Sequence, residues 1–116
     1  MSLVVVHAQT ARADVLSIIG EVDLITAPRL VSDAADAIRR GARAIVLDLH
    51  AVTFMDSAGL AALLNVLRRA TAAGGEVVLV DLQPQVRRLL ASTRVDRHFT
   101  ITDTVEQAER ILAAAG

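Results

Sequence analysis

A serine at the predicted start of a helix is the residue in this sequence best placed to do chemistry. Ser57 stands in the run Asp56-Ser57-Ala58-Gly59, which follows an apolar stretch at 44–49 and precedes leucines at helical spacing. A hydroxyl at this position can cap the helix, and a phosphate could lie on the same backbone N–H groups. The sequence therefore predicts a structural cap, a phosphorylation switch that needs no catalytic groups around it, or both, since a capping serine can also be a kinase substrate.

Catalysis by this serine has little support from the other residues. His7, His50 and His98 are scattered along the sequence outside any triad pattern, so none is assigned as a general base for Ser57. They lack metal-ligand spacing, the sequence has no Gly-rich phosphate loop, and it contains no cysteine. We expect the histidines to be ordinary surface or strand-end residues, and the chain to work without catalysis, metal or cofactor.

Length and charge limit the class of protein further. The 116 residues are enough for one domain, which we expect to span 1–116. Thirteen acidic and twelve basic residues give a formal net charge of −1, and tryptophan and tyrosine are absent, which disfavours direct nucleic-acid binding. No stretch approaches the roughly 20 apolar residues that cross a bilayer, and the first residues lack the pattern of a signal peptide. We expect a cytoplasmic protein without membrane insertion.

Hydrophobic periodicity predicts strands and helices in alternation after an opening hairpin. The predicted strands are 3–8, 15–20, 44–49, 76–80 and a short edge strand at 99–101. The predicted helices are one capped by Thr26 that ends near Arg40, one from Ser57 or Ala58 to the glycines at 74–75, one at 84–92, and one from a capping box at Asp103 and Glu106 to Ala115. This order predicts an α/β fold: a mixed, mostly parallel sheet of four to five strands, opened by an antiparallel pair, with about four helices.

Two segments of the sequence resemble the signature of the STAS domain, the fold of bacterial anti-sigma factor antagonists. In that family a strand ending in Asp-Leu precedes a hydrophobic-Met-Asp-Ser-small-Gly-Leu segment, which is matched here by Asp48-Leu49 and 54–60. The second hallmark is a Gly-Glu-hydrophobic-Asp loop before a helix carrying Thr-Ala, matched by 20–23 and by Thr26-Ala27. The resemblance covers nearly the whole chain, in the right order and spacing.

The resemblance implies roles for individual residues. Ser57 matches the serine that antagonists present to their kinase. In the family the loops after the second and third strands lie close together at one end of the sheet. Residues in the partner-binding face would then be Asp23, Thr26, Asp56, Ala58 and Gly59.

Simpler explanations remain open for these residues. Asp23 and Asp56 can be turn formers, and Gly59 can serve a close backbone approach beside Ser57. Many antagonists carry Ser or Thr where this chain has Ala58, so a role for a second hydroxyl is not expected here.

The function implied by the resemblance is partner switching. The unphosphorylated chain would bind an anti-sigma factor serine/threonine kinase and so release a sigma factor. Phosphorylation of Ser57 would end that complex, and a phosphatase would restore it. Two alternatives stay open: a STAS subunit of a larger assembly, such as a stress-signalling complex or a lipid-transport ATPase, and a nucleotide-binding STAS domain. The sequence also leaves open a weak homodimer.

A two-component receiver domain is the main rival fold. The segment around Asp48 superficially mimics the phosphoacceptor strand of such domains. Receivers need an acidic pair after the first strand and a lysine near the acyl phosphate, whereas strand 3–8 carries no acid and the chain has no lysine. The receiver interpretation therefore fails.

Overall fold

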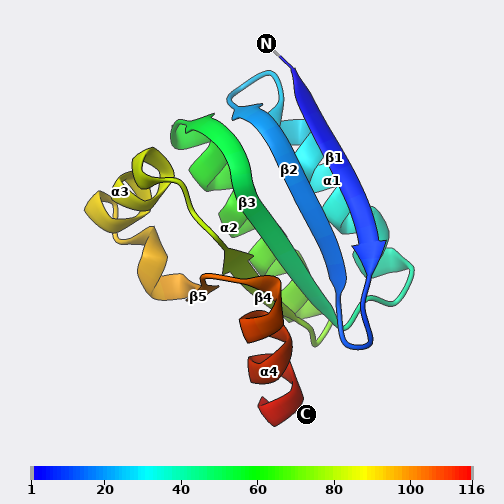
Figure 1. Ribbon diagram of the computed structural model, residues 1–116. Coiled ribbons are helices and arrows are strands. Elements are labelled where there is room, and N and C mark those ends of the chain that lie inside the picture. The colour runs from blue at the N-terminus through cyan, green and yellow to red at the C-terminus, as the bar shows by residue number, and fades with distance from the viewer. Residues whose placement is uncertain (1, 116) are drawn as a thin grey trace.

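The computed structural model describes residues 2–115, which form one α/β domain with a five-stranded sheet (Figure 1). The strands are β1 (Leu3–Gln9), β2 (Asp14–Val22), β3 (Ala44–Met55), β4 (Glu76–Val80) and β5 (Thr100–Thr102). The helices are α1 (Ala27–Arg39), α2 (Ser57–Ala72), α3 (Pro84–Ser92) and α4 (Val105–Ala115), with a 3₁₀ turn, η1 (Val95–His98), before β5. None of the helices in this part of the chain is long and apolar enough to cross a membrane.

The strands lie side by side in sequence order, from β1 at one edge to β5 at the other. β1 and β2 are antiparallel, and the remaining neighbours are parallel. This confirms the predicted opening hairpin, the mostly parallel sheet and the edge position of the last strand. The carboxyl ends of β2, β3 and β4 consequently point to the same end of the molecule.

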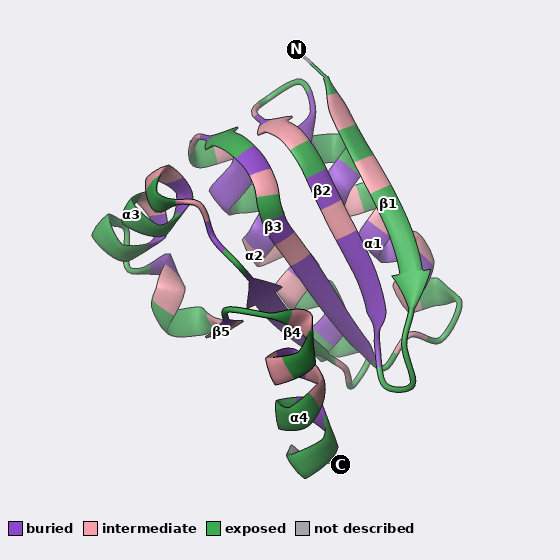
Figure 2. Cartoon of the chain, viewed as in Figure 1, coloured by how far each residue is buried: buried purple, intermediate pink, exposed green. Residues whose placement is uncertain are grey.

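Two apolar cores cover the two faces of the sheet. On one face, Leu16, Leu47 and Leu79 from three neighbouring strands are fully buried against α1, α2 and α3, which supply Leu30 and Leu63 among others. Each such side chain contributes about 1.5–3 kcal/mol through burial. Figure 2 shows this burial along the first halves of β2 and β3, their lower parts in this view. The centre of the sheet is thus a firm base for the loops that follow these strands.

The opposite core is smaller and is closed by α4. Val46 and Val78 point to this face and pack with Ala108 and Leu112 of the helix. Successive residues of a strand point to opposite faces, so the continuous apolar run of β3 supplies both cores. This explains why that run lacks the apolar–polar alternation of a half-exposed strand.

The strand before Ser57 is longer than predicted. The sequence indicated a strand over 44–49 and then a loop, but β3 continues to Met55. Val52 and Met55 are buried and pair with Gly20 and Val22 of β2. The β2–β3 register has two irregularities, one before each of these pairs. They break the simple alternation of side chains, so the sequence pattern indicated a loop. As a result, β3 leads straight into Asp56.

The start of α4 is shifted by one residue from the predicted capping box. The hydroxyl of Thr104 accepts the N–H of Gln107 at 3.1 Å, and Gln107 Oε1 accepts the N–H of Asp103 at 2.8 Å. The capping pair is therefore Thr104 and Gln107 rather than Asp103 and Glu106, with Gln107 reaching the N–H of the residue before the cap. Thr followed three residues later by Gln is an equivalent signature, so the sequence is compatible with two overlapping capping boxes.

Candidate functional site

The loops that carry the predicted site residues meet at the carboxyl ends of β2 and β3. Val22 and Met55, the last residues of these two strands, are direct neighbours in the sheet. The N–H of Asp56 lies 3.4 Å from the carbonyl oxygen of Val22 and donates to it. The loop with Asp23 therefore adjoins the start of α2, as the resemblance implied. Both lie at the end of the sheet that is uppermost in Figure 1.

Asp56, and not Ser57, caps α2. Its Oδ1 accepts the N–H of Ala58 at 2.9 Å and that of Gly59 at 3.3 Å. Asp56 has the extended backbone of an N-cap residue, with φ −121° and ψ −166°, while Ser57 is the first residue inside the helix. The expectation that the Ser57 hydroxyl caps the helix is therefore wrong, because the residue before it already holds the capping position.

The side chain of Ser57 is left free by this arrangement. The residue is exposed, and its hydroxyl has no hydrogen-bond partner among residues 2–115. Ala58, next to it, is half-buried. The first turn of α2 thus presents one accessible hydroxyl to solvent beside a carboxylate that is fixed in place.

Gly59 allows the first turn of α2 to lie directly on the end of β2. The residue is buried, and a Cβ atom added to it would lie 3.0 Å from the carbonyl oxygen of Val22 and would clash with the side chain of Met55. This is the close backbone approach that the sequence suggested. A larger residue would push Ser57 and its turn away from the sheet.

The hydroxyl of Thr26 is fastened inside the other loop. Thr26 is only 8% exposed, and its Oγ1 donates to the carbonyl oxygen of Glu21 at 2.6 Å and accepts the N–H of Asp23 at 3.0 Å. It occupies the N-cap position of α1 as predicted, but its side chain caps nothing there. The hydroxyl instead reaches back to the end of β2 and closes the loop.

The carboxylate of Asp23 holds the same loop from its other side. Its Oδ1 accepts the N–H groups of Ile25 at 2.9 Å and Thr26 at 3.0 Å. The backbone N–H of Thr26, more than any other contact, lowers the pKa of Asp23, and the hydroxyl of Thr26 and the N–H of Ile25 add to the effect. Asp23 and Asp56 therefore both act as turn formers, which is the structural explanation that the sequence left open for them.

Gln85 is a site residue that sequence reasoning missed. From α3 it makes two hydrogen bonds to the backbone of Met55: its Oε1 accepts the N–H at 3.1 Å, and its Nε2 donates to the carbonyl oxygen at 3.0 Å. The residue that precedes Asp56 is thereby held by a third element. A lone glutamine 30 positions away carries no spacing signal, so the sequence offered no means of finding it.

Exposed apolar side chains surround the site, and these were also missed. Leu24 and Ile25 are 76% and 80% exposed, and Phe54, near the end of β3, is 41% exposed. An apolar pair between the turn residues Asp23 and Thr26 was the available signal, since polar residues usually occupy such turns. Large exposed apolar groups beside polar ones are typical of protein-binding surfaces.

A groove between α1 and α2 continues this apolar surface. Its volume is about 610 Å³, and Leu24 and Ala58 line it near Ser57. Its charged lining residues are Arg39 and Arg69, on the last turns of the two helices. The groove therefore runs from Ala58, the neighbour of the exposed serine, along both helices to the two arginines.

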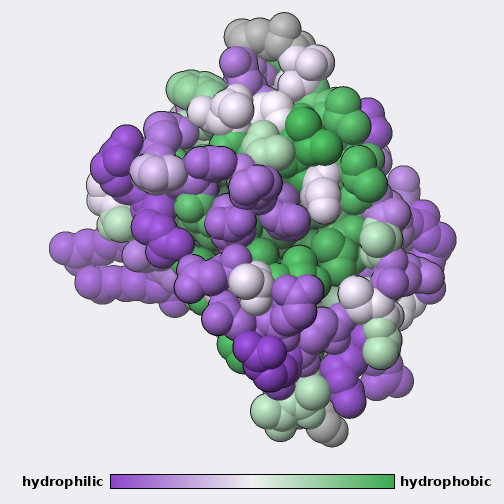
Figure 3. Space-filling model, viewed as in Figure 1, coloured by the Kyte–Doolittle hydropathy of each residue, from purple (hydrophilic) through white to green (hydrophobic). Residues whose placement is uncertain are grey.

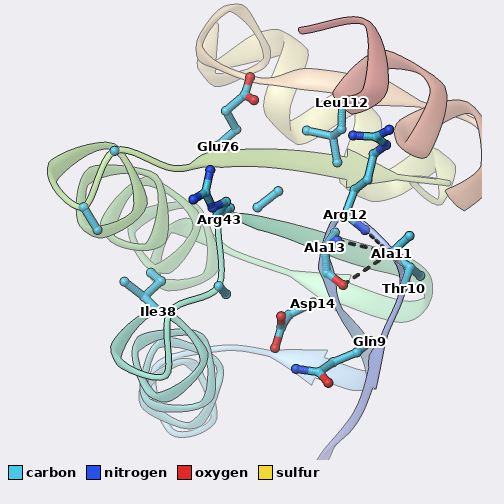
Figure 4. A pocket seen from close by; sticks show the side chains of 15 residues that line it. Gln9, Thr10, Ala11, Arg12, Ala13, Asp14, Ile38, Arg43, Glu76 and Leu112 are labelled. Carbon is cyan, nitrogen blue, oxygen red and sulfur yellow. Dashed lines mark hydrogen bonds between the residues drawn. The ribbon is translucent and has the colours of Figure 1, made fainter. Parts of the chain in front are cut away.

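A larger cavity lies at the other end of the sheet. It has a volume of about 890 Å³ and is formed by the β1–β2 hairpin and the amino ends of β3 and β4. In Figure 4, Ile38 and Arg43 lie on the opposite side of it from the hairpin residue Thr10. None of the predicted site residues lines this cavity, so it does not belong to the candidate site.

The histidines lie outside the site as well. His7 Nε2 is 2.6 Å from Asp14 Oδ2, and His50 Nδ1 is 2.9 Å from Asp81 Oδ2. Within residues 2–115, no group of three or more His, Cys, Asp or Glu side chains is arranged to hold a metal ion. Ser57 therefore has no basic partner for nucleophilic chemistry in this part of the chain.

Comparison with known proteins places this geometry in a family. The family model of the STAS domain matches residues 5–108. An anti-sigma F factor antagonist of Paenibacillus polymyxa is 36% identical over 85 residues, which are 72% of this chain and 73% of that protein. The crystal structure of an anti-sigma factor antagonist from Mycobacterium paratuberculosis matches with a TM-score of 0.87 and 28% identity, over 97% of this chain and 95% of that one.

The antagonist SpoIIAA has the same fold in two forms. Its unphosphorylated form matches with a TM-score of 0.81 and 23% identity, over 96% of this chain and 97% of that one. Its phosphorylated form, from Bacillus, matches with a TM-score of 0.72 at the same identity, over 93% and 99%. The predicted fold and its family are thus confirmed: the chain belongs to the STAS domain family.

Proposed function

We propose that this protein is an anti-sigma factor antagonist that is switched off by phosphorylation of Ser57. Unphosphorylated, it binds an anti-sigma factor serine/threonine kinase, and the sigma factor is released. The kinase then transfers the γ-phosphoryl group of its own ATP to Ser57, the complex dissociates, and a phosphatase restores the unphosphorylated chain. This protein is a substrate and a binding partner, and it supplies no catalysis itself.

The exposed, unbonded hydroxyl of Ser57 on the first turn of α2 is the observation that carries this proposal. A kinase must reach the acceptor hydroxyl of the folded protein, so this group must be accessible without unfolding of the structure around it. Relatives at 36% and 28% identity are named as antagonists, which supports the same role. Leu24, Ile25 and Phe54 supply exposed apolar surface around the acceptor for a partner to bury.

The local charges explain how one phosphate can end the complex. Phosphorylation adds about −1.5 to −2 charges. The N–H groups of Ala58 and Gly59 already bind Asp56, so a phosphate on Ser57 would find these two helix-end donors in use and a carboxylate beside it. Two unit charges ~4 Å apart interact by about 4 kcal/mol at an effective dielectric constant near 20. Because burial under a partner removes the water that screens this repulsion, an increase of about a third of that energy in the complex weakens binding roughly tenfold.

The test uses the purified anti-sigma factor kinase encoded in the same genome. Incubation with this protein and ATP should place one phosphate, mapped by mass spectrometry, on Ser57. Titration calorimetry should show that Ser57→Ala binds the kinase as the unmodified protein does, whereas Ser57→Asp binds at least about tenfold more weakly.

The matched control is Thr104→Asp. Thr104 is the exposed cap of α4, where aspartate also caps well, so this variant adds the same charge at another helix start. It should bind like the unmodified protein. Equal binding by Ser57→Asp would contradict the charge switch. A kinase that binds tightly but never phosphorylates Ser57 would favour a subunit of a larger assembly.

A further inference from the structure

The two edges of the sheet differ in how they are protected. β5 has three residues, two of them threonines. β1 has seven residues, in unbroken register with β2, and its sequence LVVVHAQ contains no lysine, arginine, acid or proline. An edge strand presents unpaired backbone N–H and C=O groups, and proteins usually protect it by charge, proline, bulges or short length. β1 has none of these protections.

Alternate side chains of β1 add an apolar surface to this edge. Val4 and Val6 lie opposite Ile19 and Ser17 of β2, on the face where Val15 packs in the α4 core. Val4 is 50% exposed, Val6 51% and Ile19 41%. The outer part of this face therefore carries aliphatic side chains in solvent.

α4 leaves this part of the face open. Its contacts with the sheet are mainly to β3, β4 and β5. In the space-filling view, hydrophobic residues are visible over β1 and β2, beside the polar surface of α4 (Figure 3). The apolar patch extends to the free edge, so a strand added there would bury both unpaired backbone and aliphatic side chains.

We propose that β1 pairs antiparallel with β1 of a second copy of this chain. With the two-fold axis at Val6, the two Val6 side chains face each other, and Val4 faces Ala8 of the second copy. These are apolar cross-strand pairs on one face of a continuous ten-stranded sheet. On this face the strand is thus complementary to itself, as a two-fold interface requires.

Net charge does not oppose this occupant. With a formal charge of −1 per chain, two copies repel each other little at neutral pH. Each chain has one such edge, so the assembly closes at two copies. An interface of one strand pair is small, which predicts a weak, concentration-dependent dimer.

Sedimentation velocity on the protein alone tests this proposal. Between about 10 μM and about 1 mM, the weight-average mass should rise toward that of two chains and no further. Val6→Lys places two ammonium groups against each other at the axis and should raise the dissociation constant at least tenfold. Ile111→Lys makes the same change in charge at a 44% exposed position on α4, away from the edge, and should dimerise normally.

Hydrogen exchange gives a second, independent readout. The β1 amides that point away from β2 should gain protection as the protein concentration rises, and the amides of β5 should not. Circular dichroism checks that each variant is folded, and Val4→Lys replaces Val6→Lys if the latter does not fold. A monomer at every concentration, growth beyond two chains, or a Val6→Lys variant that dimerises normally would overturn the proposal.

Discussion

The two hydroxyls at the starts of α1 and α2 are chemically similar but differ in what holds them. Thr26 is buried, and its hydroxyl bonds the carbonyl of Glu21 and the N–H of Asp23. Ser57 is exposed, and within the described part of the chain its hydroxyl bonds nothing. The first hydroxyl maintains a loop. The second is available to a partner.

The neighbouring aspartates explain this difference. At α2, Asp56 takes the capping position and binds the N–H groups of Ala58 and Gly59, so the helix does not need the serine. At α1, the carboxylate of Asp23 accepts the N–H groups of Ile25 and Thr26, while the buried hydroxyl of Thr26 bonds the end of β2. A hydroxyl at a helix start can therefore stay free without loss of stability where a neighbouring residue already caps the helix.

The largest effect on folding should come from Thr26→Val. Valine keeps the shape but leaves the N–H of Asp23 without its acceptor and the carbonyl of Glu21 without its donor at a partly buried site. Each unsatisfied buried group costs about 1–3 kcal/mol. Urea denaturation should show that loss, and Thr26→Ser, which keeps the hydroxyl, should lose much less. A variant as stable as the unmodified protein would show that the buried hydroxyl is dispensable.

Asp56→Ala should have the next largest effect on the free energy of unfolding. Loss of an N-cap costs about 1 kcal/mol, since two N–H groups of the first turn lose their acceptor. Asp56→Asn should retain most of the stability because asparagine caps about as well. In the same denaturation experiment, equal losses in both variants would mean that the charge of Asp56, rather than capping, stabilises the turn.

Much of this arrangement was predictable from the sequence, and the exceptions have two causes. Short-range patterns correctly placed α2 after a buried strand and indicated the close approach at Gly59. The error over capping arose because Asp and Ser are both good caps, and the sequence gives no way to choose between adjacent ones. The extension of β3 to Met55 depends on pairing with β2, which lies more than 30 residues earlier.

Contacts between distant segments were beyond sequence reasoning. Gln85 holds the backbone of Met55 from α3, and no periodicity links the two residues. The exposed pair Leu24 and Ile25 had a signal, since apolar residues interrupt a polar turn. That this pair continues into a larger apolar surface depends on the adjoining groove, because only the fold brings α1 and α2 together to form it.

Acid should weaken the loop held by Asp23. The pKa of Asp23 is lowered in the folded protein, chiefly by the N–H of Thr26, so its carboxylate stabilises the fold at pH values above the usual aspartate pKa of about 3.9. That contribution is lost as the pH falls through the lowered folded pKa. The stability difference between the unmodified protein and Asp23→Asn, measured by denaturation at several pH values, should therefore shrink in acid. A difference that does not change with pH would show that the charge contributes nothing.

The smallest effect on folding should come from Ser57→Ala, and this variant tests the comparison most directly. If the hydroxyl is free, its removal should change the free energy of unfolding by less than about 0.5 kcal/mol, as for other surface substitutions. Alanine also has the best helix propensity, so the variant can even be slightly more stable. The measurement is urea denaturation, beside Thr26→Val as the reference. A loss as large as that of Thr26→Val would mean that Ser57 has a structural bond in solution, and a residue fastened in that way would be a poor acceptor for a kinase.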